Sequence, residues 1–303
     1  MRKWIAALLC LLLACNFCPS LAEEDADALY DRGKAATDAG DYESAFELFS
    51  QAAALGNAQG QNGLGVCYLW GDGVEQSYEK ALEYITLAAE QGLAKAQFNL
   101  GAMYENGEGV EQSYEKAVEY YTLAAEQGDA DAQYNLALLY YAGEGVEQSY
   151  EKAAEYFTAA AEQGDMYALY ALGYMYYYGE GVEQSYEKAV EYFTLAAEQG
   201  DSDAQYTLGM MYYYGEDVAQ DMDKAVDYMT RAAQAGNVNA MNDLGEMYRD
   251  GEGVPQDYEK AADLFWRSWT QGGEEAGFDA GKQNYDKLVE EGKIPADYAP
   301  NAE

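Results

Sequence analysis

Gly107–Ala117 reads G-E-G-V-E-Q-S-Y-E-K-A, and the same eleven residues return at Gly143–Ala153 and at Gly179–Ala189. Near copies begin at Gly71, Gly215 and Gly251, so every start lies 36 residues after the one before. A fixed period of this length indicates stacked repeats, which bury their apolar faces against neighbours and need no single closed core. We therefore expect the 303 residues to form one tandem array rather than two or three closed domains.

The unit 129–164 shows what one repeat contains. Apolar residues recur at helical spacing through its first half, and Gly143 can end that helix in a left-handed conformation. Ser149 is a good N-cap for a second helix, which Gly164 closes. No part of the unit shows the alternation of a strand. Each unit is thus predicted to be a helix hairpin.

The glycines that close the second helices divide the chain into repeats. Six full units are predicted over 57–272, and a shorter hairpin at 23–56 precedes them. That first hairpin has a tight turn around Gly40 in place of the G-E-G-V loop.

The array is expected to end in a cap at 273–303. Trp269 stands where other units have a small residue, which implies that a different element docks there. We predict a helix over 274–291 for this role. Pro295 and Pro300 lie in a tail that we expect to be loose.

The repeats resemble the Sel1-like repeat family, a relative of the tetratricopeptide repeat. The family signature Ala-x-x-x-Leu-Gly-x-x-Tyr is met by Ala96, Leu100, Gly101 and Tyr104, and the loop and the closing A-A-E-Q-G follow. The resemblance covers about 57–272, whereas 23–56 looks more like a plain tetratricopeptide hairpin. It implies an all-α, right-handed superhelical solenoid of antiparallel helix hairpins that acts by binding other proteins.

The charge and composition exclude several functions. Seventeen Lys and Arg against 55 Asp and Glu give a net charge of −38, which repels nucleic acid and anionic membranes and favours basic partners. The chain has no histidine, so the commonest general base and metal ligand are missing. One carboxylate per loop, as at Glu108, is far from a calcium cage. We predict no enzyme activity, no metal and no cofactor.

The first 22 residues have the pattern of an export signal. Arg2 and Lys3 precede an apolar run, and small residues before Glu23 suit cleavage by signal peptidase. A bacterial lipoprotein signal, with Cys15 as the lipidated residue, is the alternative. Both interpretations place the mature chain outside the cytoplasm, either secreted or at the periplasm or cell envelope. Both predict no membrane span.

Cys67 is the only cysteine left after cleavage behind Ala22, so no intrachain disulfide is expected. It occupies a position that other units fill with Met or Leu. We therefore expect a buried apolar residue rather than a nucleophile.

Tyrosines on the first helices are the candidate functional residues. By analogy with tetratricopeptide hairpins, certain first-helix positions line a concave groove, and the middle units concentrate tyrosine there. The candidate partner-binding residues are Tyr134, Tyr141, Tyr170, Tyr174, Tyr177, Tyr178, Tyr206, Tyr213 and Tyr214. Tyrosine combines a large rigid ring with a hydroxyl, which suits binding surfaces.

Two kinds of partner fit such a groove. A protein or peptide segment with basic residues would use stacking and cation–π contacts, and its binding would weaken with salt. A glycan of the cell wall is the alternative, and its binding would be insensitive to salt. A second set of tyrosines holds one repeat position and is explained by packing: Tyr68, Tyr104, Tyr140, Tyr176, Tyr212 and Tyr248.

Overall fold

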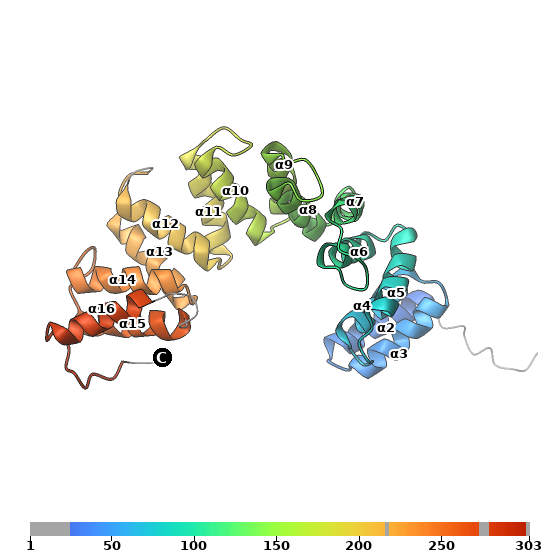
Figure 1. The fold of residues 1–303 in the computed structure, drawn as a ribbon, viewed down its shortest axis with the longest axis horizontal. Coiled ribbons are helices and arrows are strands. Elements are labelled where there is room, and N and C mark those ends of the chain that lie inside the picture. The colour runs from blue at the N-terminus through green and yellow to red at the C-terminus, as the bar shows by residue number, and fades with distance from the viewer. Residues whose placement is uncertain (1–24, 216–217, 273–278, 301–303) are drawn as a thin grey trace, which may run out of the picture. The chain divides into compact units, whose positions relative to one another are not determined.

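The computed structural model describes residues 25–215, 218–272 and 279–300, and all regular structure within these ranges is helical (Figure 1). The chain divides into two compact units, the first ending at Asp129 and the second beginning at Ala130. The predicted leader at 1–22, with Cys15, lies outside the described residues.

The helices follow one another as hairpins within each unit (Figure 1). The first unit contains α2 (Ala26–Asp38), α3 (Tyr42–Ala54), α4 (Ala58–Trp70), α5 (Tyr78–Glu90), α6 (Ala94–Asn106) and α7 (Tyr114–Ala125). The second unit contains α8 (Ala130–Ala142), α9 (Tyr150–Glu162), α10 (Met166–Tyr178), α11 (Tyr186–Glu198), α12 (Ser202–Tyr214), α13 (Met222–Gln234), α14 (Val238–Asp250), α15 (Tyr258–Gly272) and α16 (Asp279–Glu290). Helices α2 to α14 with even numbers are the first helices of their repeats, and those with odd numbers are the second helices.

The repeated loop joins the two helices of each hairpin by local bonds. Gly143 adopts φ 75° and donates its N–H to the carbonyl of Leu139 at 2.8 Å, as a left-handed C-cap does. The Gln148 side chain donates to the carbonyl of Tyr141 at 2.8 Å, which satisfies another carbonyl at the end of α8. Ser149 then accepts from the backbone N–H at position 152 and starts α9. The predicted hairpin with its glycine and serine caps is therefore confirmed.

Small residues and one large ring fill the interior of each repeat. In the second unit Ala189, Phe193 and Ala196 of α11 are fully buried, as is Leu208 of the next first helix. A Cβ atom built at Gly173 would lie 2.5 Å from the Phe193 ring, so glycine lets α10 approach that ring closely. Cys67 is likewise buried, as predicted, and burial raises the pKa of its thiol to about 11.

The tyrosines that we attributed to packing form a repeated stack. Each first-helix ring lies nearly parallel to a second-helix tyrosine ring, with centroids 5.4–6.0 Å apart, in the pairs Tyr68–Tyr84, Tyr104–Tyr120, Tyr140–Tyr156, Tyr176–Tyr192 and Tyr212–Tyr228. A lysine Nζ lies 4.5–5.0 Å from the centroid of the same first-helix ring, from Lys80, Lys116, Lys152, Lys188, Lys224 and, over Tyr248, Lys260. Packing therefore explains this tyrosine position.

The C-terminal helix docks on the last hairpin as Trp269 predicted. The Trp266 ring lies 5.3 Å from the Tyr285 ring of α16, and the Lys282 ammonium lies 5.8 Å from the Trp269 ring. The helix is described over Asp279–Glu290, and 273–278 of the predicted range lie outside the described residues.

The expectation of a loose tail after this helix is wrong for the residues up to 300. Ile294 is only 3% exposed and belongs to the same apolar cluster as Phe265 and Leu288. The Tyr298 hydroxyl lies 3.0 Å from the Asp263 carboxylate. Ile294 is an isolated apolar residue in this part of the chain, so it gave no periodic signal in the sequence. Its burial with Phe265 of α15 nevertheless holds the segment after α16 against the last hairpin.

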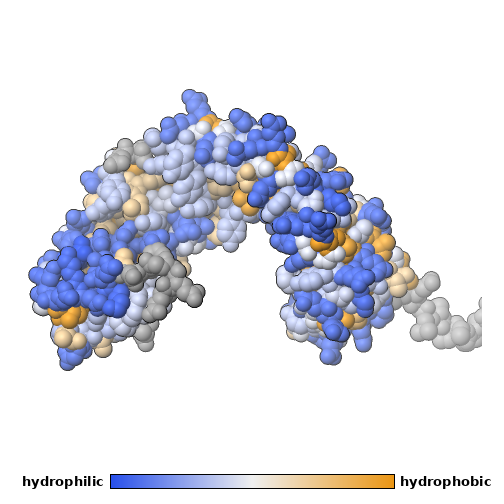
Figure 2. Space-filling view, in the orientation of Figure 1, coloured by the Kyte–Doolittle hydropathy of each residue, from blue (hydrophilic) through white to orange (hydrophobic). Residues whose placement is uncertain are grey.

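Hydrophilic side chains dominate the face drawn in Figure 2, and apolar side chains gather there in small patches. Within the described residues, no helix has the length and apolar character that crossing a membrane requires.

Candidate partner-binding site

All nine candidate tyrosines lie in the second unit, on the first helices α8, α10 and α12. Tyr178 and Tyr214, at the C-terminal ends of α10 and α12, are the most exposed of them, at 60% and 59%. Tyr141 is exposed at the end of α8, and Tyr134, Tyr170 and Tyr206 are half-buried.

A cavity of about 240 Å³ opens between α10 and α12 and gathers five of the candidates. We call it the aromatic cavity; it is lined by Tyr174, Tyr177, Tyr178, Tyr206, Thr207, Met210, Met211 and Tyr214. Among the residues that the structure describes, those that line this cavity are all uncharged. The cavity is smaller than most sites for drug-sized ligands, so its size suits a single inserted side chain.

The rings around the aromatic cavity support one another. Tyr174 stacks on Tyr178 with centroids 6.0 Å apart, and Tyr177 meets Tyr178 edge-on at 4.9 Å. Behind them, the Tyr170 hydroxyl donates to the Tyr174 hydroxyl at 3.2 Å, and both rings rest on the buried Phe193. Tyr170 therefore positions the wall of the cavity rather than lining it.

A second cavity of about 200 Å³ adjoins the first, since both are lined by Met210 and Tyr214. We call it the acidic cavity; its lining is Met210, Tyr213, Tyr214, Met229, Asp243, Glu246, Met247, Asp250 and Glu252. Four carboxylates thus lie next to the tyrosines. The carboxylates come from α14 and from the loop after it.

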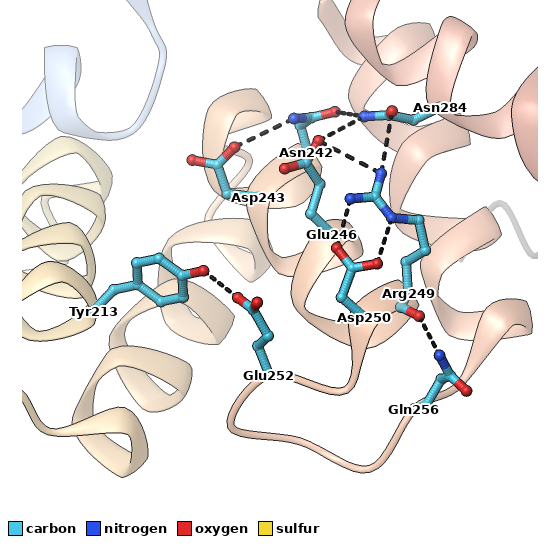
Figure 3. A network of polar contacts seen from close by, with 9 residues as sticks. All are labelled: Tyr213, Asn242, Asp243, Glu246, Arg249, Asp250, Glu252, Gln256 and Asn284. Carbon is cyan, nitrogen blue, oxygen red and sulfur yellow. Dashed lines mark hydrogen bonds and ion pairs between the residues drawn. The ribbon is translucent and has the colours of Figure 1, made fainter.

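A polar network closes the acidic cavity on the side of α16 (Figure 3). Arg249 binds Asp250 through two nitrogens at 2.6 and 2.9 Å, and its guanidinium holds the pKa of that carboxyl below the usual range. Arg249 also lies 3.8 Å from Glu246, and Asn284 of α16 donates to Glu246 at 3.0 Å. Asp250 and Glu246 are therefore already paired within the protein.

The other two carboxylates of this cavity accept from candidate tyrosines. The Tyr206 hydroxyl donates to Asp243 at 2.9 Å. The Tyr213 hydroxyl donates to Glu252, as Figure 3 shows. Burial, followed by the nearby Asp243, raises the pKa of Tyr206. The bond to Glu252 raises the pKa of Tyr213 to about 12.

Tyr134 and Tyr141 lie apart from the aromatic cavity. Tyr134 packs against Phe157 at 5.7 Å and Tyr167 at 6.0 Å. The Tyr141 hydroxyl donates to Glu180 of the next loop at 2.6 Å, and this bond raises the pKa of Tyr141 to about 12.

The nine candidate tyrosines do not include the other residues that line the two cavities. Thr207 and Met211 line the aromatic cavity but were not among the candidate residues. Asp243 and Glu252 line the acidic cavity, and in the sequence they look like ordinary acidic surface residues. The repeat periodicity would have given a signal for Glu252, because a glutamate recurs at this place in the loop. Among the described residues, no cluster of three or more acidic or sulfur ligands could hold a metal ion.

Comparison with known proteins identifies the repeats. A model of the Sel1 repeat matches residues 24–57, 58–93, 94–129, 130–165, 167–201, 202–237 and 238–266, so it also covers the first hairpin. A comparison with curated proteins finds no match.

Two solved structures resemble the chain closely. The protective antigen c5321 of uropathogenic Escherichia coli, described as an SLR fold, is 32% identical with a TM-score of 0.80, and the match covers 89% of this chain. The chain spans 57% of the length of that protein. A Sel1 repeat protein from Oxalobacter formigenes is 34% identical with a TM-score of 0.71, over 80% of this chain and 96% of that one. The chain therefore belongs to the Sel1 repeat family, whose all-helical solenoids are scaffolds that generally mediate protein–protein interaction.

Proposed function

We propose that the protein is an exported scaffold that captures an extended segment of a partner protein on the tyrosine-bearing first helices of its second unit. The observation that carries this proposal is the pair of adjoining cavities, one aromatic and one acidic, beside the exposed Tyr178 and Tyr214. Exposed aromatic rings around a side-chain-sized cavity are typical of the centres of binding surfaces.

The charge of the chain favours a basic segment. A net charge of −38 speeds the approach of a cationic partner and repels acidic ones. The carboxylates of the acidic cavity lie next to the aromatic cavity, because the linings of the two cavities share Tyr214 and Met210.

Replacing Tyr178 and Tyr214 together by alanine is expected to weaken partner binding by at least about tenfold, as loss of paired hot-spot residues does. The test introduces a photo-crosslinking amino acid at position 178 or 214, isolates the crosslinked partner, and measures its affinity for wild type and variant. Both rings are well exposed, so the variant should keep its helical circular dichroism.

Trp70 provides a matched control. It holds the same place in its repeat as Tyr178, but in the first unit, and it is 66% exposed. Trp70→Ala should leave partner affinity unchanged. Equal losses from both variants would contradict the proposed site, and binding of purified cell-wall glycan that does not change with salt would favour the glycan alternative instead.

Export is part of the proposal and has its own test. The sequence pattern around residue 22 supports it, and the related E. coli protein is named as a protective antigen. We expect intact-mass measurement of the protein from its native cells to show a chain that begins at Glu23, or a lipidated chain that begins at Cys15. A full-length chain that retains Met1 in the cytoplasmic fraction would contradict export.

A further inference from the structure

The structural tyrosines of each repeat carry their own cation. In each of six repeats a lysine Nζ lies 4.5–5.0 Å from the centroid of the first-helix tyrosine ring. In five of these repeats a second tyrosine stacks on the same ring. These distances are within the range in which a cation is attracted to the ring face. At this first-helix position the cation over the tyrosine is always a lysine, while the Arg231 guanidinium lies 5.2 Å from the second-helix ring of Tyr228.

Four tyrosines of the aromatic cavity differ from the structural tyrosines in this respect. Among the described residues no lysine or arginine lies over the rings of Tyr174, Tyr178, Tyr206 or Tyr214. Within the described part of the chain, no basic side chain lines either cavity. The nearby Arg249 is held by Asp250 and Glu246.

The surroundings favour a positive charge at this place. Tyrosine rings have a negative face to which a cation is attracted, and the adjoining cavity brings four carboxylates. Asp243 and Glu252 have hydroxyl donors but no cationic partner among the residues that line the cavity. The field at the aromatic cavity is therefore negative, while the cavity lining itself is uncharged.

We propose that the aromatic cavity is a cage for the ammonium group of a lysine side chain presented by the partner protein. This inference rests on the proposed function and names the side chain that the site selects. The apolar stem of lysine would lie on Met210 and Met211, and its ammonium would face the tyrosine rings, as the lysines of the chain do in every full repeat.

Lysine suits the cavity better than arginine does. A guanidinium binds best where acceptors match its planar fork, whereas the described lining of the cavity offers phenols, one threonine hydroxyl and thioethers. An ammonium is a compact charge that an aromatic box can surround. An uncharged apolar side chain would fit by size but would leave the ring faces and the negative field unused.

The test uses three short peptides that consist of Gly and Ser except for a single central residue, which is lysine, arginine or norleucine. Binding is followed through the methyl resonances of Met210 and Met211, assigned by substitution, at an ionic strength of about 1 M. There the Debye length is about 3 Å, so long-range attraction to the acidic surface is screened. We expect saturable shifts of both methyl groups with the lysine peptide, and at least about tenfold weaker binding of the norleucine peptide.

Two variants complete the test. The double change Tyr178→Leu and Tyr214→Leu keeps apolar bulk but removes both π faces, and it should weaken the lysine peptide about tenfold. Trp70→Leu should have no effect. Equal binding of lysine and norleucine peptides, tighter binding of the arginine peptide, or no shift at Met210 and Met211 would overturn the inference. The proposed function would then still be judged by the crosslinked partner, whose affinity is measured independently.

Discussion

Gly181→Ala is expected to lower the free energy of unfolding by about 2–5 kcal/mol, because the new methyl group has no space and the backbone is left-handed. Gly181 adopts φ 67°, and a Cβ atom built there would lie 2.2 Å from the carbonyl carbon and oxygen of Tyr150. Tyr150 is the first residue of α9, in the preceding repeat. The loop glycine thus packs one repeat onto the backbone of another, where no side chain can move aside.

Gly164→Ala is the control for the backbone conformation alone. Gly164 adopts φ 89° and has nothing within 4 Å of a built Cβ atom, so only the left-handed conformation is penalised, by about 1–2 kcal/mol. Urea unfolding followed by circular dichroism measures both variants. If the two changes cost the same, the close approach between repeats does not contribute to stability.

The hairpins could be predicted because their signals are local. Gly143 and Ser149 act within one or two turns of their own helices, and the 36-residue period repeats the signal along the chain. Trp269 predicted a docking element because a large ring cannot occupy a place where helices meet through alanine. Such signals lie within a few residues of the elements that they predict, so they do not depend on which distant residues come together.

The sequence predicted which helix stripe carries the candidate tyrosines, but not which of these rings line a cavity. Tyr170, Tyr174 and Tyr178 follow one stripe of α10 at intervals of four residues, yet Tyr170 supports Tyr174 from behind while the other two line the cavity. Which ring is covered depends on Phe193 and on the adjacent repeat, so the helical period alone does not decide it.

The acidic cavity could not be read from the sequence for a related reason. Tyr213, Asp243 and Glu252 come from α12, α14 and a loop, and they meet only because two repeats stack in one register. In an acidic chain, a single Asp or Glu carries almost no information about its surroundings. The contrast between tyrosines with and without a lysine over the ring likewise appears only in three dimensions.

Phe193→Ala is expected to reduce both stability and binding, and comparison with Phe157→Ala separates the two effects. Phe193 and Phe157 hold the same place in adjacent repeats, with exposures of 0% and 1%. Removing either ring should lower the free energy of unfolding by about 3–5 kcal/mol, the usual range for a buried phenylalanine. The two variants should therefore lose about the same free energy of unfolding.

Binding should distinguish them, because the two rings support different tyrosines. Phe193 lies 5.2 Å from Tyr174, edge-on at 84°, and so holds one wall of the aromatic cavity. Phe157 instead packs against Tyr134, which does not line that cavity. Loss of an aromatic contact of this kind is worth about 1 kcal/mol, so Phe193→Ala should weaken the lysine peptide about fivefold.

The measurement is a titration at a temperature where circular dichroism shows both variants to be folded. Phe157→Ala should bind the lysine peptide as the wild type does, even though it is equally destabilised. If both variants lose binding to the same extent, recognition depends on the stability of the whole unit. If only Phe193→Ala loses affinity for the lysine peptide, the buried Phe193 ring acts on the site by fixing the position of Tyr174. A core residue that recurs in each repeat would then support a binding function that only one repeat has.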